Sequence, residues 1–291
     1  MKNILMIAAE YPPCLSAGVQ RTYHFSENLL KSGWCPHILS AHERIYRNVD
    51  KGVNVSSQIA SNVRRAFALD VSRHLSIKGK YLGWLENPDR FASWYFLGWR
   101  KGLDMIRNNH IDIIWSTYPI STAHWIGLKL KLQTGLPWVA DFRDPMHAHV
   151  DETSSITRKA KSIDRLTIKH ADVLVFATEK MKQLYLKSYP DINSSKFYVI
   201  ENGYDEKLFD HLTRTRPKSK MYRLLYSGAL YPSGRDPVPL FLAISRLANA
   251  GKITTESFRL VFRGAGDGHD YINKLAELGI KGLVEFLEPV P

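Results

Sequence analysis

Two carboxylates bracket a guanidinium in the stretch 139–145, which reads Val-Ala-Asp-Phe-Arg-Asp-Pro. An apolar run, 136–140, leads directly into Asp141, Arg143 and Asp144. This pattern predicts a buried parallel strand that delivers its charges at its carboxyl end, where ligands bind in α/β proteins because helix amino termini gather there. We therefore treat the three charged residues as candidate catalytic residues. A structural ion-pair cluster is the alternative, because such clusters are also common at strand ends.

A glycine near the amino terminus is a second candidate. Gly18 follows an apolar run at 4–9 and a loop, and it lies at or near the first turn of a helix predicted over 19–31. Backbone amides at such a turn can meet an anion without an intervening side chain. The alternative is a small residue that only lets the helix pack, since a single glycine is not the GxGxxG dinucleotide fingerprint.

Three polar residues at alternate positions, His147, His149 and Asp151, could in principle hold a metal. Polar residues in a loop more often face water, and three ligands leave the coordination shell incomplete. We therefore predict no metal site and no cofactor.

The composition is that of an ordinary globular protein with excess positive charge. The 291 residues carry a formal net charge of +12, which favours an anionic partner such as nucleotide phosphates or a membrane surface. The cations are dispersed, which argues against a nucleic-acid binder. Two cysteines, Cys14 and Cys35, suit a reducing compartment, and the amino-terminal apolar run is too short for a signal peptide. We expect a cytoplasmic protein, with any membrane contact peripheral at the inner face.

Strand and helix patterns alternate along the chain. Apolar runs at 4–9, 36–41, 111–116, 136–140, 172–177 and 197–200 predict strands, and helices are predicted over 19–31, 90–108, 121–134, 155–170 and 179–188. After a turn signal at 202–203 and a polar, basic stretch, the pattern restarts with strands at 223–227, 259–264 and 284–287 and helices at 238–250 and 268–278. This alternation predicts α/β architecture with two Rossmann-like doubly wound parallel-sheet domains, 1–204 and 223–291, the second incomplete, joined by a linker at 205–222.

The region 43–99 is less regular. A strand at 53–59 and a basic helix at 64–75 are predicted there. Aromatic residues crowd 81–99 among lysines and arginines, a mixture that suits base stacking or a membrane interface. A helix packed against the core is the favoured interpretation, because apolar stripes at helical spacing are usually core.

Several motifs together give the chain a family resemblance. The most specific is 138–145, which resembles the aspartate-phenylalanine-arginine-aspartate motif found in one branch of the family 4 glycosyltransferases, retaining enzymes with the GT-B fold. The supporting motifs are Tyr11-Pro12-Pro13 with Gly18, Pro88-Asp89-Arg90, the run 171–175, the hinge-like stretch 199–205, the run 228–231 with Arg235-Asp236-Pro237, and the glycine loop 264–267. The resemblance covers most of the chain.

The resemblance implies transfer of a sugar from a nucleotide-diphosphate donor to an acceptor hydroxyl, with retention of configuration and without a metal. The nucleotide would bind the second domain and its sugar would face the first. Gly18, Gly228, Gly264 and Gly266 would lie at the donor phosphates, with Arg235 as the cation that stabilises the leaving diphosphate. Arg143 lies near the place of a catalytic histidine in some relatives. It stays protonated and is a poor general base, so it is expected to orient Asp141 or to pair with phosphate.

The acceptor is expected to be a glycan or a lipid-linked sugar of the cell envelope, worked on at the inner membrane face. One departure is Ala229, where many relatives carry an arginine, and the glutamates that hold the donor in the family would lie beyond residue 291. A carboxyl-terminally truncated enzyme, or an inactive fragment that only binds ligands, is therefore the main alternative. A nicotinamide oxidoreductase lacks support because GxGxxG does not follow the first strand.

Overall fold

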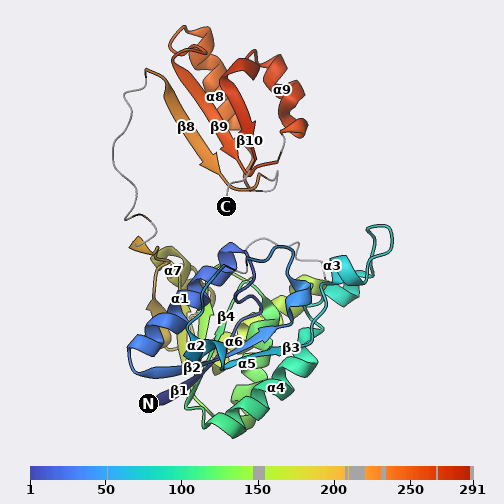
Figure 1. The fold of residues 1–291 in the computed structure, drawn as a ribbon, viewed down its shortest axis with the longest axis vertical. Coiled ribbons are helices and arrows are strands. Elements are labelled where there is room, and N and C mark those ends of the chain that lie inside the picture. The colour runs from blue at the N-terminus through green and yellow to red at the C-terminus, as the bar shows by residue number, and fades with distance from the viewer. Residues whose placement is uncertain are drawn as a thin grey trace. The chain divides into compact units, whose positions relative to one another are not determined.

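The computed structural model describes residues 1–50, 52–146, 155–206, 209, 220–230, 234–266 and 268–288, with backbone alone at 155–157. The chain divides into two compact units, Met1–Asp205 and Glu206–Pro291, each described here by itself (Figure 1). Residues 207–208 and 210–219, which make up most of the expected linker, lie outside the described ranges.

The first unit is built on a parallel sheet in the order β3-β2-β1-β4-β5-β6-β7. Its strands are β1 (Lys2–Ile7), β2 (Trp34–Ala41), β3 (Val63–Ala66), β4 (Ile113–Thr117), β5 (Trp138–Phe142), β6 (Val173–Phe176) and β7 (Phe197–Val199). Its helices are α1 (Ala17–Lys31), α2 (Ser57–Ala60), α3 (Val71–His74), α4 (Trp94–Asn109), α5 (Ser121–Thr134), α6 (Ser155–His170) and α7 (Glu179–Ser188), with short 3-10 turns at Glu43–Ile45 (η1), Gly83–Glu86 (η2) and Ser194–Lys196 (η3). The doubly wound prediction is confirmed for this unit.

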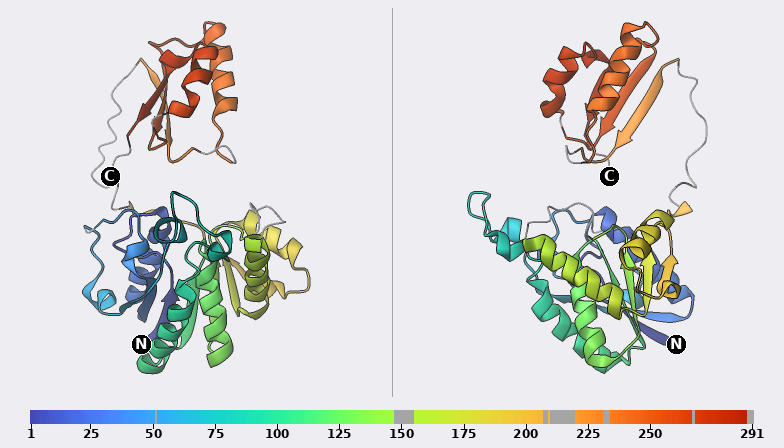
Figure 2. Two further views of the ribbon diagram at one scale, coloured as in Figure 1. Left: turned by 90° about the vertical axis from the view of Figure 1, so that its right-hand side faces the viewer. Right: turned by 180° about the vertical axis from the view of Figure 1, so that it is seen from behind.

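Alternating side chains of the strands separate two apolar layers. Leu5, Ile7 and Ile114 belong to a core that includes residues of α4, α5 and α6. Met6 and Trp115 belong to a second cluster against α1 and α2. Figure 2 shows these two groups of helices on opposite faces of the sheet. Because the strand order reverses between β1 and β4, their carboxyl ends border the crevice in which ligands bind in such sheets.

Of the two predictions for 43–80, the strand at 53–59 is wrong, and the helix at 64–75 is confirmed only at Val71–His74 (α3). Residues 53–56 lie outside the sheet, and Ile59 is buried from the short helix α2. The basic segment begins instead as the edge strand β3, in which Val63 pairs with Ile38. Charged side chains are tolerated at an edge because one side of the strand is open. Arg65 pairs with Glu43 at 3.1 Å and donates to Tyr46 Oη at 2.9 Å.

The second unit contains a parallel sheet in the order β10-β9-β8, formed by β8 (Tyr222–Ser227), β9 (Phe258–Arg263) and β10 (Val284–Leu287). Its helices are α8 (Val238–Asn249) and α9 (Ile272–Glu277), with 3-10 turns at His269–Tyr271 (η5) and Lys281–Leu283 (η6). Phe241 of α8 and Phe262 of β9 form the centre of its core. The mixed α/β class with parallel sheets in both units agrees with the sequence prediction.

Candidate functional site

Asp141 lies inside β5 rather than beyond its end, and its side chain is fully buried. The Oδ1 atom accepts hydrogen bonds from Arg21 Nη2 at 2.8 Å and Nε at 3.2 Å. The Oδ2 atom accepts from Arg21 Nε at 3.0 Å and from Thr117 Oγ1 at 2.8 Å. Thr117 is the β4 residue in register with Asp141, so sheet pairing itself brings the hydroxyl to the carboxylate. Both oxygens of Asp141 therefore accept hydrogen bonds from within the chain, and the residue has a structural role beside the site.

Arg21, which binds Asp141, also donates hydrogen bonds to the segment after β7. Its Nη2 donates to Ile200 O at 2.8 Å, and its Nη1 donates to Glu201 O at 3.0 Å and to Asn202 Oδ1 at 3.2 Å. The fork geometry of a guanidinium allows one side chain to serve a carboxylate and several carbonyls at once. Arg21 thus ties α1, β5 and residues 200–202 together. Sequence reasoning missed it, because a single arginine on a helix carries no distinctive pattern.

Arg143 lies half-buried just after β5 and bridges two neighbouring loops. Its Nε donates to Tyr118 O, after β4, and its Nη1 donates to Gly18 O, at the start of α1. Burial lowers the pKa of Arg143, while the nearby carboxylates Asp141, Glu10 and Asp144 act in the opposite direction. Asp144 itself is exposed. The predicted residues Gly18, Arg143 and Asp144 therefore lie at the β1–β4 switch point, where the sheet topology favours a ligand.

The space above Gly18 is filled by the chain's own carboxylate. Glu10 Oε2 accepts a hydrogen bond from Ser16 Oγ at 2.7 Å, and a methyl group added at Gly18 would collide with that same oxygen. A negative group at a helix amino terminus is favourable because the backbone amides there lack partners. The anion expected at Gly18 is thus already supplied by Glu10, a residue that the sequence analysis did not identify as a candidate.

This contact gives a simple prediction. In the wild-type background, Gly18→Ala should gain less unfolding free energy than the roughly 0.5–1 kcal/mol that alanine contributes over glycine in a helix, because the new methyl group displaces the Glu10 carboxylate. In Glu10→Ala the same glycine substitution should gain more, which urea unfolding of the two single variants and the double variant would measure. Additive effects would show that the two residues are not coupled.

His124 lies beneath the site in α5 and is fully buried. Its Nδ1 is 2.7 Å from Ser116 Oγ, which also accepts from Trp138 Nε1 at 2.9 Å. Its Nε2 has no hydrogen-bond partner among the described residues. Burial, with a smaller contribution from Arg143, lowers the pKa of His124 to about 3. The imidazole is therefore neutral in the folded protein and acts as a core residue.

The lowered pKa predicts a pH-dependent stability. Between about 3 and the unfolded value of about 6.5, the unfolded chain binds more protons at this site than the folded chain. The contribution of His124 should be fully present above pH 6.5 and should decrease on acidification by at most about 1.4 kcal/mol per pH unit. Unfolding free energies measured from pH 7 to pH 4 should have a shallower slope in His124→Asn. The same change at the exposed His110 should leave the slope unaltered, and a wild-type slope in His124→Asn would contradict the assignment.

In the second unit, three predicted residues lie at one edge of the sheet. Ser227, Arg263 and Leu287 are in register across the three strands. Gly228 and Gly264, which follow two of these residues, are therefore neighbours at the carboxyl edge, and both have positive φ values, 136° and 71°. Arg235 is exposed three residues before α8, and its Nη1 would lie 3.7 Å from a methyl group added at Gly228. The amides of the two glycines donate to Arg263 O and Leu287 O at 3.0 Å. The group that this edge offers to an anion is therefore the guanidinium of Arg235, beside two loops whose glycines leave room for a ligand.

The remaining candidates are less informative. Gly266 also has a positive φ, 85°, and extends the loop after β9. Tyr231 and Asp267 of the quoted motifs, and the metal alternative His147, His149 and Asp151, lie outside the described residues. Within the described ranges no group of three or more His, Cys, Asp or Glu side chains could hold a metal ion. Likewise, no helix in the described part of the chain is long and apolar enough to cross a membrane.

Comparisons with known proteins agree with this geometry. Residues 79–208 match the family model described as Glycosyltransferase Family 4. A search of curated protein sequences gives no match.

Solved structures share the fold across the whole chain. Sucrose-phosphate synthase from Thermosynechococcus elongatus is 15% identical with a TM-score of 0.65, and the match covers 100% of this chain and 71% of that one. HepE from Anabaena in complex with UDP is 12% identical with a TM-score of 0.60, covering 100% and 70%. The catalytic domain of starch synthase IV from Arabidopsis thaliana, bound to ADP and acarbose, is 13% identical with a TM-score of 0.59, covering 100% and 74%.

At these identities the structural matches show the fold alone. The family model applies to the residues that it covers. Residues 79–208 therefore match the Glycosyltransferase Family 4 model, in agreement with the resemblance drawn from the sequence motifs, and the chain has the fold of the GT-B glycosyltransferases.

Proposed function

We propose that the chain transfers a sugar from a nucleotide-diphosphate sugar to an acceptor hydroxyl, with retention of anomeric configuration and without a metal. The observation that carries the proposal is the edge of the second sheet, where the loops that begin at the positive-φ glycines Gly228 and Gly264 lie beside Arg235. A leaving diphosphate develops negative charge, and fixed amide dipoles with a guanidinium stabilise that charge. UDP in the HepE complex and ADP in the starch synthase complex are ligands of the same chemical kind.

We assign different roles to the charged residues of the first unit. Arg143 is a fixed cation, and the exposed Asp144 is the carboxylate best placed to bind an acceptor hydroxyl. Asp141 acts through Arg21, which it holds in place, and so is a positioning residue. Envelope glycan synthesis in the cytoplasm, on a glycan or a lipid-linked acceptor, is the setting that suits the net charge of +12.

The test is calorimetric titration of the full chain with UDP-, GDP- and ADP-glucose, followed by proton NMR of each binding donor. Saturable binding of one nucleotide, with slow release of sugar as the α-anomer from an α-linked donor, is the expected result. Release of the β-anomer would contradict retention. Binding without release, even with candidate acceptors, would favour a ligand-binding module, which the engagement of both Asp141 oxygens also suits. Absence of binding at millimolar donor would contradict the transferase proposal.

A further inference from the structure

The segment 75–85, here called the apolar hairpin, follows α3 in the first unit and includes the first residues of η2. Ile77 and Lys80 exchange two backbone hydrogen bonds, at 2.8 and 3.0 Å. The two residues between them, Lys78 and Gly79, have φ values of 51° and 76°. Two central residues with positive φ form the tight turn that closes a two-residue hairpin. The segment is therefore an ordered hairpin.

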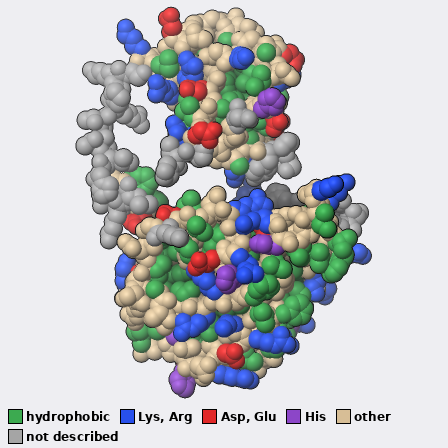
Figure 3. Space-filling view, turned by 45° about the vertical axis from the view of Figure 1, so that its right-hand side comes forward, with side chains coloured by type: hydrophobic (Ala, Val, Ile, Leu, Met, Phe, Trp, Pro, Cys, Tyr) green, Lys and Arg blue, Asp and Glu red, His purple; other side chains and the backbone are tan. Residues whose placement is uncertain are grey.

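The side chains of this hairpin are unusual for a surface. Ile77 is 80% exposed, Trp84 67% and Leu82 61%. Its two charged residues, Lys78 and Lys80, are both basic and exposed. Glu86, which directly follows the hairpin, accepts a hydrogen bond from Tyr81 Oη at 2.6 Å. Figure 3 shows hydrophobic and basic side chains next to one another on this face of the first unit. Large apolar side chains exposed together, with cations among them, typically mark a site of interaction.

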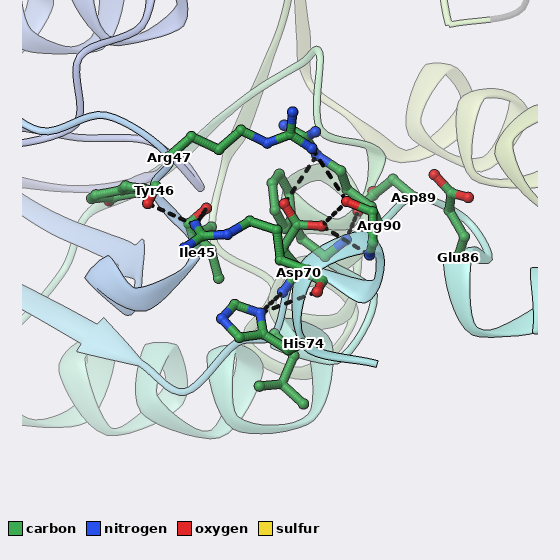
Figure 4. A network of polar contacts seen from close by, with 12 residues as sticks. Ile45, Tyr46, Arg47, Asp70, His74, Glu86, Asp89 and Arg90 are labelled. Atoms are coloured by element: carbon green, nitrogen blue, oxygen red, sulfur yellow. Dashed lines mark hydrogen bonds and ion pairs between the residues drawn. The ribbon is translucent and has the colours of Figure 1, made fainter. Parts of the chain in front are cut away.

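Two carboxylates fix the base of the hairpin, the buried Asp70 and the partly exposed Asp89. Asp89 accepts hydrogen bonds from Thr122 N at 2.7 Å, Thr122 Oγ1 at 2.8 Å and Phe91 N at 2.9 Å, which anchors the segment to the start of α5. Asp70 caps α3 and lies 4.0 Å from Arg90, as Figure 4 shows. The apolar side chains are thus held outward by a rigid base.

We infer that the apolar hairpin inserts into the surface of an anionic lipid bilayer. Trp84, Ile77 and Leu82 would enter the interfacial region, where tryptophan is favoured, while Lys78 and Lys80 would meet lipid phosphates. A bilayer suits this surface better than a protein groove, because aromatic, aliphatic and basic side chains occur together, the neighbouring Glu86 is bonded to Tyr81, and the whole chain is strongly positive.

The position of the hairpin relates membrane contact to the candidate site of the first unit. The hairpin follows β3, and its base contacts the amino terminus of α5, which follows β4. It therefore lies at the carboxyl edge of the sheet, the edge that carries Arg143 and Asp144. Membrane insertion would hold this edge close to a lipid-linked acceptor. The choice of acceptor rests on the proposed function, but lipid binding itself does not.

The test is co-sedimentation of the full chain with vesicles of phosphatidylcholine alone or mixed with phosphatidylglycerol, without any sugar donor. Binding should require the anionic lipid. The Ile77→Asp/Trp84→Ser variant should weaken it about tenfold or more. The Lys78→Glu/Lys80→Glu variant should weaken it by about fivefold or more per lysine, because each lysine near an anionic surface contributes about 1 kcal/mol.

Matched substitutions elsewhere control for general changes of hydrophobicity and charge. Leu132 is 60% exposed near the end of α5, at the opposite edge of the sheet, so Leu132→Asp should bind vesicles like the wild type. Lys180→Glu/Lys187→Glu on α7 removes the same charge, and it should weaken binding less than the hairpin lysine pair.

Three results would overturn the inference: no binding to anionic vesicles, equal binding by both hairpin variants and wild type, or a change in self-association without a change in vesicle binding. Because donor titration is measured separately, failure of lipid binding would leave the proposed transfer intact. Failure of transfer would equally leave lipid binding intact.

Discussion

The Arg21→Met variant is expected to lose about 3–5 kcal/mol of unfolding free energy in the first unit. The reason is the carboxylate left behind. Asp141 is fully buried and receives three of its four hydrogen bonds from Arg21, so removal of the guanidinium strands a charge in the protein interior. Breaking one side of a buried ion pair costs far more than the pair itself contributes. Loss of the bonds to the carbonyls of Ile200 and Glu201 adds to the effect.

Urea unfolding followed by tryptophan fluorescence measures this loss cleanly. All seven tryptophans lie between Trp34 and Trp138, so the signal reports the first unit alone. A second substitution, Asp141→Leu, should restore much of the stability of Arg21→Met, because no uncompensated charge then remains. The unfolding free energy of Arg21→Lys should lie between those of Arg21→Met and the wild type, since an ammonium keeps the charge but lacks the planar donor geometry of the guanidinium. A loss below about 1 kcal/mol in Arg21→Met would contradict the structure at this position.

The fold was largely accessible from sequence because its signals are local. Uninterrupted apolar runs mark strands buried on both faces, and 3.6-residue periodicity marks the helices that cover them. The helix expected over 121–134 and the observed α5 coincide, with Gly135 ending it at φ 70°. Most other differences are shifts of a few residues at element ends, where local patterns carry little information.

The errors cluster where tertiary context overrides local pattern. Residues 64–75 carry a basic, helix-like pattern, yet Arg64 and Arg65 belong to an edge strand because Val63–Ala66 pair with β2. The core-facing helix predicted over 90–108 corresponds to α4, and Phe91 and Trp94 at its start are buried, whereas Trp84, which precedes the predicted helix, is exposed. Aromatic composition alone does not distinguish these two outcomes.

The site was predictable only in part, for a related reason. The sequence indicated Asp141, Arg143 and Asp144 as a charged cluster, but it could not show that Arg21, 120 positions away, occupies Asp141. Nor could it show that Glu10 fills the space above Gly18. The first contact depends on how the sheet topology places α1 against β5, and the second on the conformation of the connection between β1 and α1. Such proximity is a property of topology and not of spacing along the chain.

In the second unit the largest expected effect on activity belongs to Arg235. In the proposed transfer, Arg235→Ala should lower kcat by about 10²–10³-fold, the loss typical when one preorganised group that stabilises developing charge is removed. Binding of a nucleoside diphosphate should weaken as well, while a nucleoside without phosphates should be affected little. Arg235→Lys should retain part of the activity, because the charge remains but the planar fork is lost.

Arg246 provides the matched control for this experiment. It is also exposed and lies in the last turn of α8, at the far end of the helix from Arg235. Arg246→Ala removes the same charge from the same unit, so a general electrostatic effect on an anionic donor would appear in both variants, whereas a phosphate contact would appear only in Arg235→Ala. Equal kcat values in the two variants would show that the edge formed by Gly228 and Gly264 does not use Arg235. The leaving charge would then have to be met by other groups of the loops after β8 and β9, because the amides of Gly228 and Gly264 already donate to Arg263 O and Leu287 O.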